Sequence, residues 1–192
     1  MRYDIRISGS GGQGIVLLGI IIAEAAILEG MNVAQTQSYG PEARGGSSKS
    51  EIVISDGEID YPKALRLDCL LAMSQKSCDD YFGDLKPEGI LIVDSTYVRH
   101  IPIQKGYRIP FTRIAKEKLK ADYVANIVAL GAFSVLTPIL KKSSLKDALL
   151  KRVPKGTERL NLLAFEEGVK AGRIAKRTSI PIIISERVDE DT

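Results

Sequence analysis

Two glycine-rich segments hold the residues of this chain whose types and spacing could do chemistry. The first is Gly9-Ser10-Gly11-Gly12-Gln13-Gly14, a G-x-G-x-x-G pattern between a strand pattern at Tyr3–Ser8 and an apolar helix pattern at Ile15–Glu29. Glycines let a backbone approach a phosphate closely, and the first N–H groups of the following helix face its negative charge. The segment therefore predicts a phosphate-binding turn, or a turn that serves only close strand-to-helix packing.

A dinucleotide site needs one more group, a carboxylate at the end of the second strand that binds the ribose hydroxyls. The second strand pattern, Asn32–Ser38, contains no carboxylate, since Glu29 belongs to the preceding helix and Glu42 to the following loop. The sequence therefore disfavours NAD or FAD at this turn. A stand-alone NAD- or flavin-binding oxidoreductase stays an alternative interpretation.

The second segment, Ser38–Ser47, carries an aromatic ring, a carboxylate and a guanidinium on a loop with one proline and three glycines. Loops that follow the carboxyl ends of strands form the ligand crevice of an open α/β sheet, so we expect this loop beside the first turn. Arg44 and Lys49 could then bind a phosphate or carboxylate together with the backbone N–H groups of the turn. The alternative is that Arg44 anchors a subunit interface by pairing with an acidic side chain.

The chain has few residues for covalent, metal or redox chemistry. Its two cysteines, Cys69 and Cys78, and its one histidine, His100, cannot assemble a zinc or iron–sulfur site from Cys and His. We find no nucleophile elbow, Walker motif or general base with an orienting partner. Both thiols are expected to be inert, and a reaction at this surface would take most of its reacting groups from other chains.

Composition and charge exclude several classes of protein. The 192 residues are 44% hydrophobic and 27% charged, which rules out disorder and small disulfide scaffolds. The net charge of +3 is too small to indicate a nucleic-acid partner, but residues 1–96 hold 8 basic and 14 acidic side chains and residues 97–192 hold 19 and 10. The basic half predicts solvated helix faces, or a surface for an acidic partner or phosphorylated ligand. Because no apolar run approaches the ~20 residues that span a bilayer, we expect a cytoplasmic protein without a membrane segment.

The elements that must position these residues predict an α/β fold, a three-layer α/β/α domain over residues 1–178 with a mixed, mostly parallel sheet. Apolar runs at Asp68–Met73 and Ile90–Val93 suit the centre of the sheet. A hairpin turn at Asp56-Gly57, returning through Glu58–Tyr61, would make the sheet mixed. Further expected elements are the strand Ser50–Ser55, a helix capped by Ser74, a helical pattern after Pro102 and Pro110, and the helices Val124–Leu136, Ser144–Val153 and Thr157–Lys176.

A C-terminal tail, 179–192, is set apart from this domain. Its apolar segment Ile180–Ile184 needs a surface to cover. We expect it to add an edge strand to its own sheet or to dock on another chain, and Pro181 limits it to an edge.

Residues in both glycine-rich segments and beyond resemble one known family. The pattern covers about residues 3–168 and is most specific in the block Tyr39–Gly46. It is similar to the gamma subunit of 2-oxoacid:ferredoxin oxidoreductases, and most similar to the 2-oxoglutarate (KorC-type) gamma subunit. The matching runs are Gly9–Gly14, Ala23–Ala26, Gln37–Gly46, Ser55-Asp56, Ile59–Pro62, Asn126–Gly131 and Arg152–Thr157.

The resemblance implies a fold like the gamma domain of pyruvate:ferredoxin oxidoreductase and a role as a non-autonomous subunit. The complete enzyme oxidatively decarboxylates a 2-oxoacid to acyl-CoA and passes electrons to ferredoxin. Thiamine diphosphate and Mg²⁺ would lie on its alpha and beta subunits and iron–sulfur clusters on beta or delta, with no cofactor bound by this chain alone. A homodimer of the isolated chain stays open, because exposed partner surfaces often self-associate.

For this chain the resemblance implies a part in the coenzyme A site and in the assembly interface, with no catalytic residue of its own. A purely structural interaction subunit, whose loops never touch a ligand, is the alternative. The candidate coenzyme A-binding residues are Gly11, Gly12, Gln13, Gly14, Tyr39, Arg44 and Lys49.

A substitution at Arg44 tests this assignment. A charge-assisted contact from an arginine is worth about 1.5–3 kcal/mol, so we expect Arg44→Ala to raise the apparent Michaelis constant for coenzyme A by roughly ten- to a hundred-fold. Steady-state kinetics of the reconstituted enzyme at varied coenzyme A measure this change. An unchanged constant would remove Arg44 from the coenzyme A site and favour its role at an interface.

Overall fold

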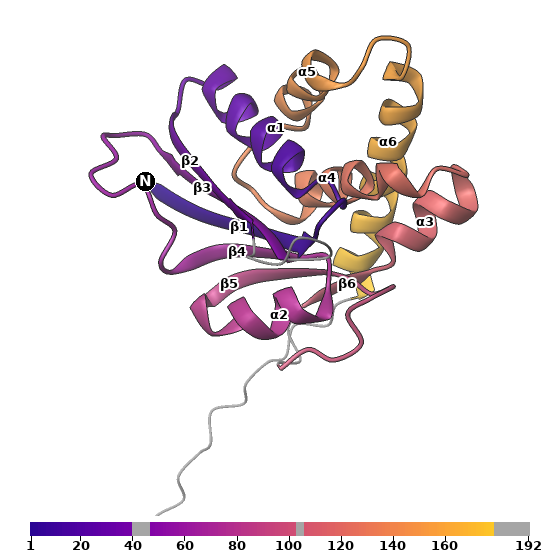
Figure 1. Ribbon diagram of the computed structural model, residues 1–192. Coiled ribbons are helices and arrows are strands. Elements are labelled where there is room, and N and C mark those ends of the chain that lie inside the picture. Colours follow the sequence, from indigo (N-terminus) through magenta and orange to yellow (C-terminus); the bar gives the residue numbers. More distant parts are fainter. Residues whose placement is uncertain (40–46, 103–105, 179–192) are drawn as a thin grey trace, which may run out of the picture.

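The computed structural model describes residues 1–39, 47–102 and 106–178, so Arg44 and the apolar tail segment Ile180–Ile184 lie outside the described residues. Within these ranges the chain folds into one six-stranded sheet of order β2-β3-β1-β4-β5-β6, with helices on both faces (Figure 1). This confirms the expected α/β fold with a mixed sheet.

The first half of the sheet is built around β1 (Arg2–Ser10), which leads through the glycine turn into α1 (Ile15–Leu28). The helix carries the chain to β2 (Asn32–Tyr39) at one edge of the sheet. β3 (Ser47–Ser55) then runs antiparallel to both β2 and β1 and lies between them. This insertion, which the sequence analysis did not anticipate, makes the sheet mixed.

The hairpin expected at Asp56-Gly57 is wrong, because Glu58–Tyr61 form no strand. The physical reason lies in the strand order. β3 is already paired on one side with β1 and on the other with β2, so a return strand would find no free edge beside it. The chain instead crosses from β3 to the next strand as an irregular segment.

The second half of the sheet continues from β1 with three parallel strands, β4 (Leu67–Ala72), β5 (Leu85–Asp94) and β6 (Tyr107–Ile109). Between β4 and β5 lie α2 (Gln75–Tyr81) and a short 3-10 turn, Phe82–Asp84. Ser74 caps α2 as expected, since its Oγ accepts the N–H of Ser77 at 3.2 Å. The helical pattern expected after Pro102 and Pro110 begins only after Pro110, at Phe111, because the strand β6 lies between the two prolines. A three-residue strand is too short to show an alternating pattern.

In the described part of the chain, four α-helices follow β6. They are α3 (Phe111–Lys118), α4 (Ala125–Leu136), α5 (Lys142–Arg152) and α6 (Glu158–Thr178). Together with α1 they cover one face of the sheet, whereas α2 packs on the other (Figure 1). The buried helix expected at Val124–Leu136 and the two amphipathic helices after it are confirmed.

Two separate hydrophobic cores follow from the alternation of side chains along the strands. Ile5, Ile7 and Ile52 face the large helical layer. Val53 and Leu70 belong to a smaller hydrophobic cluster on the opposite face, the face covered by α2. The sheet is therefore heavily covered on one face and lightly covered on the other.

The helical layer depends on a close crossing of α4 and α6 at glycines. A Cβ at Gly168 would lie 1.9 Å from the carbonyl oxygen of Val128, and one at Gly131 would lie 2.0 Å from that of Phe165. Both distances are far below van der Waals contact, so the two backbones touch at this crossing and leave no space for a side chain.

We expect Gly168→Ala to lower the free energy of unfolding by about 1–3 kcal/mol or more, because the added methyl group forces α6 away from α4. A shifted midpoint of urea unfolding with an unchanged slope measures this loss. Gly83→Ala is the matched control, since a Cβ there meets nothing within 4 Å. Equal stability of the two variants would contradict the backbone contact.

Candidate functional site

The glycine turn between β1 and α1 is held in a fixed shape by its glutamine. Gln13 Oε1 accepts the N–H of Ser10 at 2.7 Å, and its Nε2 donates to the carbonyl of Met73 at 3.1 Å, which joins the ends of β1 and β4. Gly12 and Gly14 have φ of +88° and +70°, a region that L side chains rarely adopt. The backbone therefore requires glycine at positions 12 and 14, and Gln13 positions the turn.

Two helices begin beside this turn. No side chain caps the N-terminus of α1, and neither α1 nor α4 has an acidic residue in its first turn. Asn126 at the start of α4 donates to the carbonyl of Gly14 at 3.3 Å, which holds the two helix ends together. The positive ends of two helix dipoles thus point to one place, and the first N–H groups of α1 remain for a ligand.

A pocket of about 320 Å³ opens at this place, at the carboxyl edge of the sheet. Tyr97 and Tyr123 are both exposed there, Tyr123 by 73%. Thr112 also lines the pocket, and its hydroxyl donates a hydrogen bond to Asp94 Oδ2 at 2.6 Å. The lining residues are Gly11, Gly12, Gln13, Tyr97, Thr112, Asp122, Tyr123 and Ala125.

The sequence analysis missed Tyr97, Thr112, Asp122 and Tyr123 as candidates. One signal was present, since Tyr97 follows the carboxyl end of the apolar strand β5 by three residues. Asp122 and Tyr123 carry no such signal, because they reach the pocket through a 3-10 turn (Asp122–Val124) that precedes α4.

Lys49 lies in a different pocket, of about 380 Å³, on the face of the sheet that carries α2. Its Nζ is 3.5 Å from Glu51 Oε1 and 5.4 Å from the centre of the Tyr81 ring. The other lining residues are Arg6, Thr36, Gln37, Ser38, Lys63, Ala64 and Leu65. Lys49 and the glycine turn thus belong to two pockets.

The strand register brings the strand ends that flank the two glycine-rich segments to one edge of the sheet. Ser48 of β3 pairs with Gly9 of β1 on one side and with Tyr39 of β2 on the other. The strand ends that lead into both segments therefore lie in one row, two strands apart. Of the candidate residues, Arg44 falls outside the described part of the chain, and for Tyr39 only the backbone is described.

A buried arginine organises the second pocket. Arg6 donates from Nε and Nη2 to Glu51 Oε1 at 2.9 and 2.6 Å, and from Nη2 to the carbonyl of Ala64 at 2.8 Å. Nη1 contacts the Asp84 carboxylate, and the guanidinium lies 4.8 Å from the Tyr81 ring. All of its nitrogens are engaged, so Arg6 is a structural cation rather than one free to bind a ligand.

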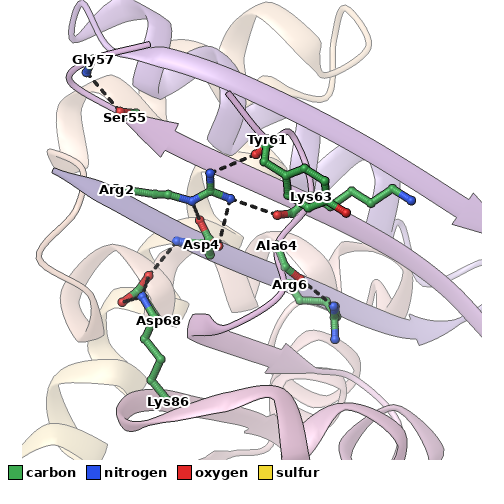
Figure 2. Close-up of polar contacts among 10 residues, drawn as sticks. All are labelled: Arg2, Asp4, Arg6, Ser55, Gly57, Tyr61, Lys63, Ala64, Asp68 and Lys86. Carbon is green, nitrogen blue, oxygen red and sulfur yellow. Dashed lines mark hydrogen bonds and ion pairs between the residues drawn. The ribbon is translucent and has the colours of Figure 1, made fainter. Parts of the chain in front are cut away.

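Arg2, on the same face of β1, fastens the irregular segment that follows β3 (Figure 2). Its guanidinium donates to the carbonyls of Tyr61 and Lys63 at 2.9 and 3.0 Å and to Asp4 Oδ1 at 2.9 Å. Backbone carbonyls hold this segment in place, which leaves the side chains of Tyr61 and Leu65 exposed. The result is a rigid surface loop with apolar side chains directed away from the core.

The two thiols lie in apolar surroundings. Burial raises the pKa of Cys78 to about 11 and raises the pKa of Cys69 further. Both are free cysteines. Within the described ranges no group of three His, Cys, Asp or Glu side chains converges to hold a metal ion, and no helix there is long and apolar enough to cross a bilayer.

Comparisons with known proteins agree on one family. The profile described as pyruvate ferredoxin/flavodoxin oxidoreductase matches residues 4–171. The chain is 51% identical over 178 residues to 2-oxoglutarate synthase subunit KorC of Methanocaldococcus jannaschii, a match that covers 90% of this chain and 95% of that one.

Solved structures agree with the sequence match. The gamma subunit of keto/oxoacid ferredoxin oxidoreductase from Geobacter sulfurreducens superposes with a TM-score of 0.82 at 45% identity, over 91% of this chain and 98% of that one. A 2-oxoglutarate:ferredoxin oxidoreductase from Magnetococcus marinus, solved with 2-oxoglutarate, coenzyme A and succinyl-CoA bound, superposes with a TM-score of 0.80 at 26% identity. That match covers 90% of this chain and 31% of the Magnetococcus chain.

The ionic cluster around Arg6 makes a testable contribution to stability. We expect Arg6→Met to lower the free energy of unfolding by about 3–5 kcal/mol, because Glu51 would stay buried without its main partner. Adding Glu51→Gln should recover a large part of the loss, since the stranded charge is removed with it. Urea unfolding of both single variants and the double variant measures the coupling. Losses that simply add would show that the two side chains do not stabilise each other.

Proposed function

The chain belongs to the pyruvate ferredoxin/flavodoxin oxidoreductase family, and we propose that it forms part of the coenzyme A site and of the subunit interface in such an enzyme. It is the gamma subunit of a 2-oxoacid:ferredoxin oxidoreductase and is similar to the 2-oxoglutarate (KorC) type. The enzyme is an oxidoreductase of several subunits. From the similarity to KorC we propose 2-oxoglutarate as the oxoacid, with succinyl-CoA as the product.

We assign the other cofactors of the reaction to the other subunits. An iron–sulfur cluster needs about four cysteine thiolates, whereas this chain has Cys69 and Cys78, both buried on the sheet and α2. The residues of this chain do not fit such a cluster. We therefore propose that alpha, beta and delta subunits hold thiamine diphosphate, Mg²⁺ and the clusters, and that ferredoxin receives its electrons there.

The observation that carries the coenzyme A proposal is the uncapped N-terminus of α1 at a pocket that the N-terminus of α4 also faces. Free N–H groups and two helix dipoles favour an anion such as a pyrophosphate. Gly11 and Gly12 are exposed in the same wall, so a phosphate can approach the backbone without meeting a side chain.

The adenine ring of coenzyme A would lie on the tyrosine side of this pocket. Asp122 stands next to Tyr123 there, and its carboxylate disfavours a phosphate but not a neutral ring. Tyr123 and Tyr97 offer exposed aromatic faces on which a base can stack. Lys49, near the start of β3, and Arg44, which precedes β3 in the sequence, would attract the remaining phosphate over a longer distance.

Strand order speaks against a stand-alone dinucleotide enzyme. In a Rossmann site the second strand lies next to the first, and its carboxylate reaches the ribose. Here β3 separates β1 from β2, and β2 contains no Asp or Glu. The glycine turn is therefore not combined with a second strand whose carboxylate could bind the ribose of a nicotinamide cofactor.

The interface proposal rests on the loop between β3 and β4, which Arg2 and Arg6 hold through its backbone carbonyls. Tyr61 and Leu65 are 47% and 60% exposed, although the backbone between them is fixed by Arg2 and Arg6 (Figure 2). A rigid loop with apolar side chains loses little conformational entropy when it binds, which favours a lasting contact with a partner subunit.

Two tyrosine substitutions separate the two roles, and each is the control for the other. We expect Tyr123→Ala to raise the Michaelis constant for coenzyme A by roughly 5- to 100-fold in the assembled enzyme, since stacking of a base on an aromatic ring is worth about 1–3 kcal/mol. Tyr61→Ala should leave that constant unchanged and weaken retention of this chain in the complex, measured by co-purification. A normal constant in Tyr123→Ala would place coenzyme A elsewhere, and full retention of Tyr61→Ala would remove that loop from the interface.

A further inference from the structure

An apolar groove lies at the sheet edge opposite β2, away from both pockets described above. It has a volume of about 430 Å³ and is lined by residues of β6, α3 and the last turns of α6. These three elements lie side by side at that edge of the sheet (Figure 1). Ile109 and Ile114 contribute to its floor, and Ile174 stands at its rim with 62% of its surface exposed. The lining residues are Gly106–Pro110, Ile114, Lys118, Glu167, Lys170, Ala171, Ile174, Ala175 and Thr178.

The edge beside this groove is open among the described residues. β6 pairs with β5 on one side, and no described strand lies on its other side. An exposed strand edge offers unpaired backbone N–H and C=O groups to any extended segment nearby. The groove thus combines an apolar surface with a backbone template.

The chain itself supplies a segment that matches both features. Thr178, the last described residue of α6, lines the groove, and the sequence continues Ser179-Ile180-Pro181-Ile182-Ile183-Ile184. We propose that Ile180–Ile184 binds this groove as an extended segment along the outer side of β6. Three consecutive β-branched residues favour an extended backbone, and a proline is tolerated on an edge strand.

The lengths agree with this placement. From Thr178 back to Glu167, the groove follows α6 for 11 residues, which at ~1.5 Å per residue is about 16 Å. Five extended residues span about 16 Å at ~3.3 Å each, so Ile180–Ile184 would cover the groove after the chain turns back at Ser179.

The distribution of charge also favours a segment that runs back along α6. The rim carries Arg108, Lys118 and Lys170, against a single carboxylate, Glu167, which binds both lysines. The residues after Ile184 include Glu186, Asp189, Glu190 and Asp191 with one arginine between them. A segment folded back along α6 would bring these acidic residues toward the basic rim.

Tethering explains why the chain's own segment fills the groove rather than a partner. A short covalent connection gives the segment an effective concentration on the order of millimolar at this site. The proposal is independent of the coenzyme A site, which lies at the carboxyl edge of β1, so it can fail or succeed without affecting the proposed function.

A thiol placed on the rim tests the proposal in the full chain. Ile174→Cys introduces a reporter in the groove, and Ile27→Cys is the matched control, since Ile27 is 60% exposed on α1. The native cysteines are buried, and burial raises the pKa of Cys78 to about 11, so we expect both thiols to react slowly. We expect a thiol reagent to label the reporter in Ile174→Cys at least tenfold more slowly than in Ile27→Cys. Adding Ile182→Asp and Ile184→Asp should restore fast labelling only at position 174.

The remaining outcomes are equally informative. Equal labelling at positions 174 and 27 in the full chain would overturn the proposal, as would protection that the two aspartates do not relieve. Protection that increases with protein concentration would assign the groove to a second copy of this chain. Protection that is present only after the other subunits are added would assign it to one of them. Each of these two results would also overturn the proposal.

Discussion

The two-faced strand β1 at the centre of the sheet is the constraint on which the rest of the structure depends. Ile5 and Ile7 face the helical layer, and Arg6 faces the lightly covered side. A buried guanidinium without partners would be very costly, so the fold supplies Glu51 from β3, Asp84 after α2 and a backbone carbonyl from the loop between β3 and β4. One side chain thereby ties together four parts of the chain that lie far apart in the sequence.

The two faces of the sheet and its carboxyl edge differ in how they are covered among the described residues. The helical face is filled by close packing, with α4 and α6 in backbone contact. Among the described residues, a pocket lies at the carboxyl edge beside the glycine turn, and the N-termini of α1 and α4 lie next to it. On the face of β1 that carries Arg2 and Arg6, the two guanidiniums bind backbone carbonyls of the loop between β3 and β4, whose side chains Tyr61 and Leu65 are exposed. The glycine turn and the loop that Arg2 and Arg6 hold thus lie on different parts of the sheet, which is why we propose separate ligand and interface roles for them.

Much of the fold followed from pattern alone. Long segments that are apolar on nearly all sides, such as Ile15–Leu28 and Ala125–Leu136, exceed the usual length of a buried strand, and their prediction as helices was correct. The hairpin predicted after β3 was wrong. Asp56-Gly57 favours a turn, but this local signal does not show whether a paired strand follows the turn. β6 was missed because three residues carry too little periodicity. At the candidate site the glycines were found by their spacing, whereas Tyr97 and Tyr123 come from separate loops that no local pattern connects.

The sequence by itself determined the α/β class, the glycine turn, the shortage of metal and redox groups, and the family, because each of these depends on residue types at short spacing. Tertiary structure alone decided that β3 lies between β1 and β2, that Lys49 and the glycine turn occupy two pockets, and that residues of β6, α3 and α6 line an apolar groove. The physical reason is the same in each case. The order of the strands, and the face of the sheet toward which each side chain points, depend on burying the apolar surfaces and pairing the buried charges at the same time. The residues that pack or pair with one another are many positions apart in the chain.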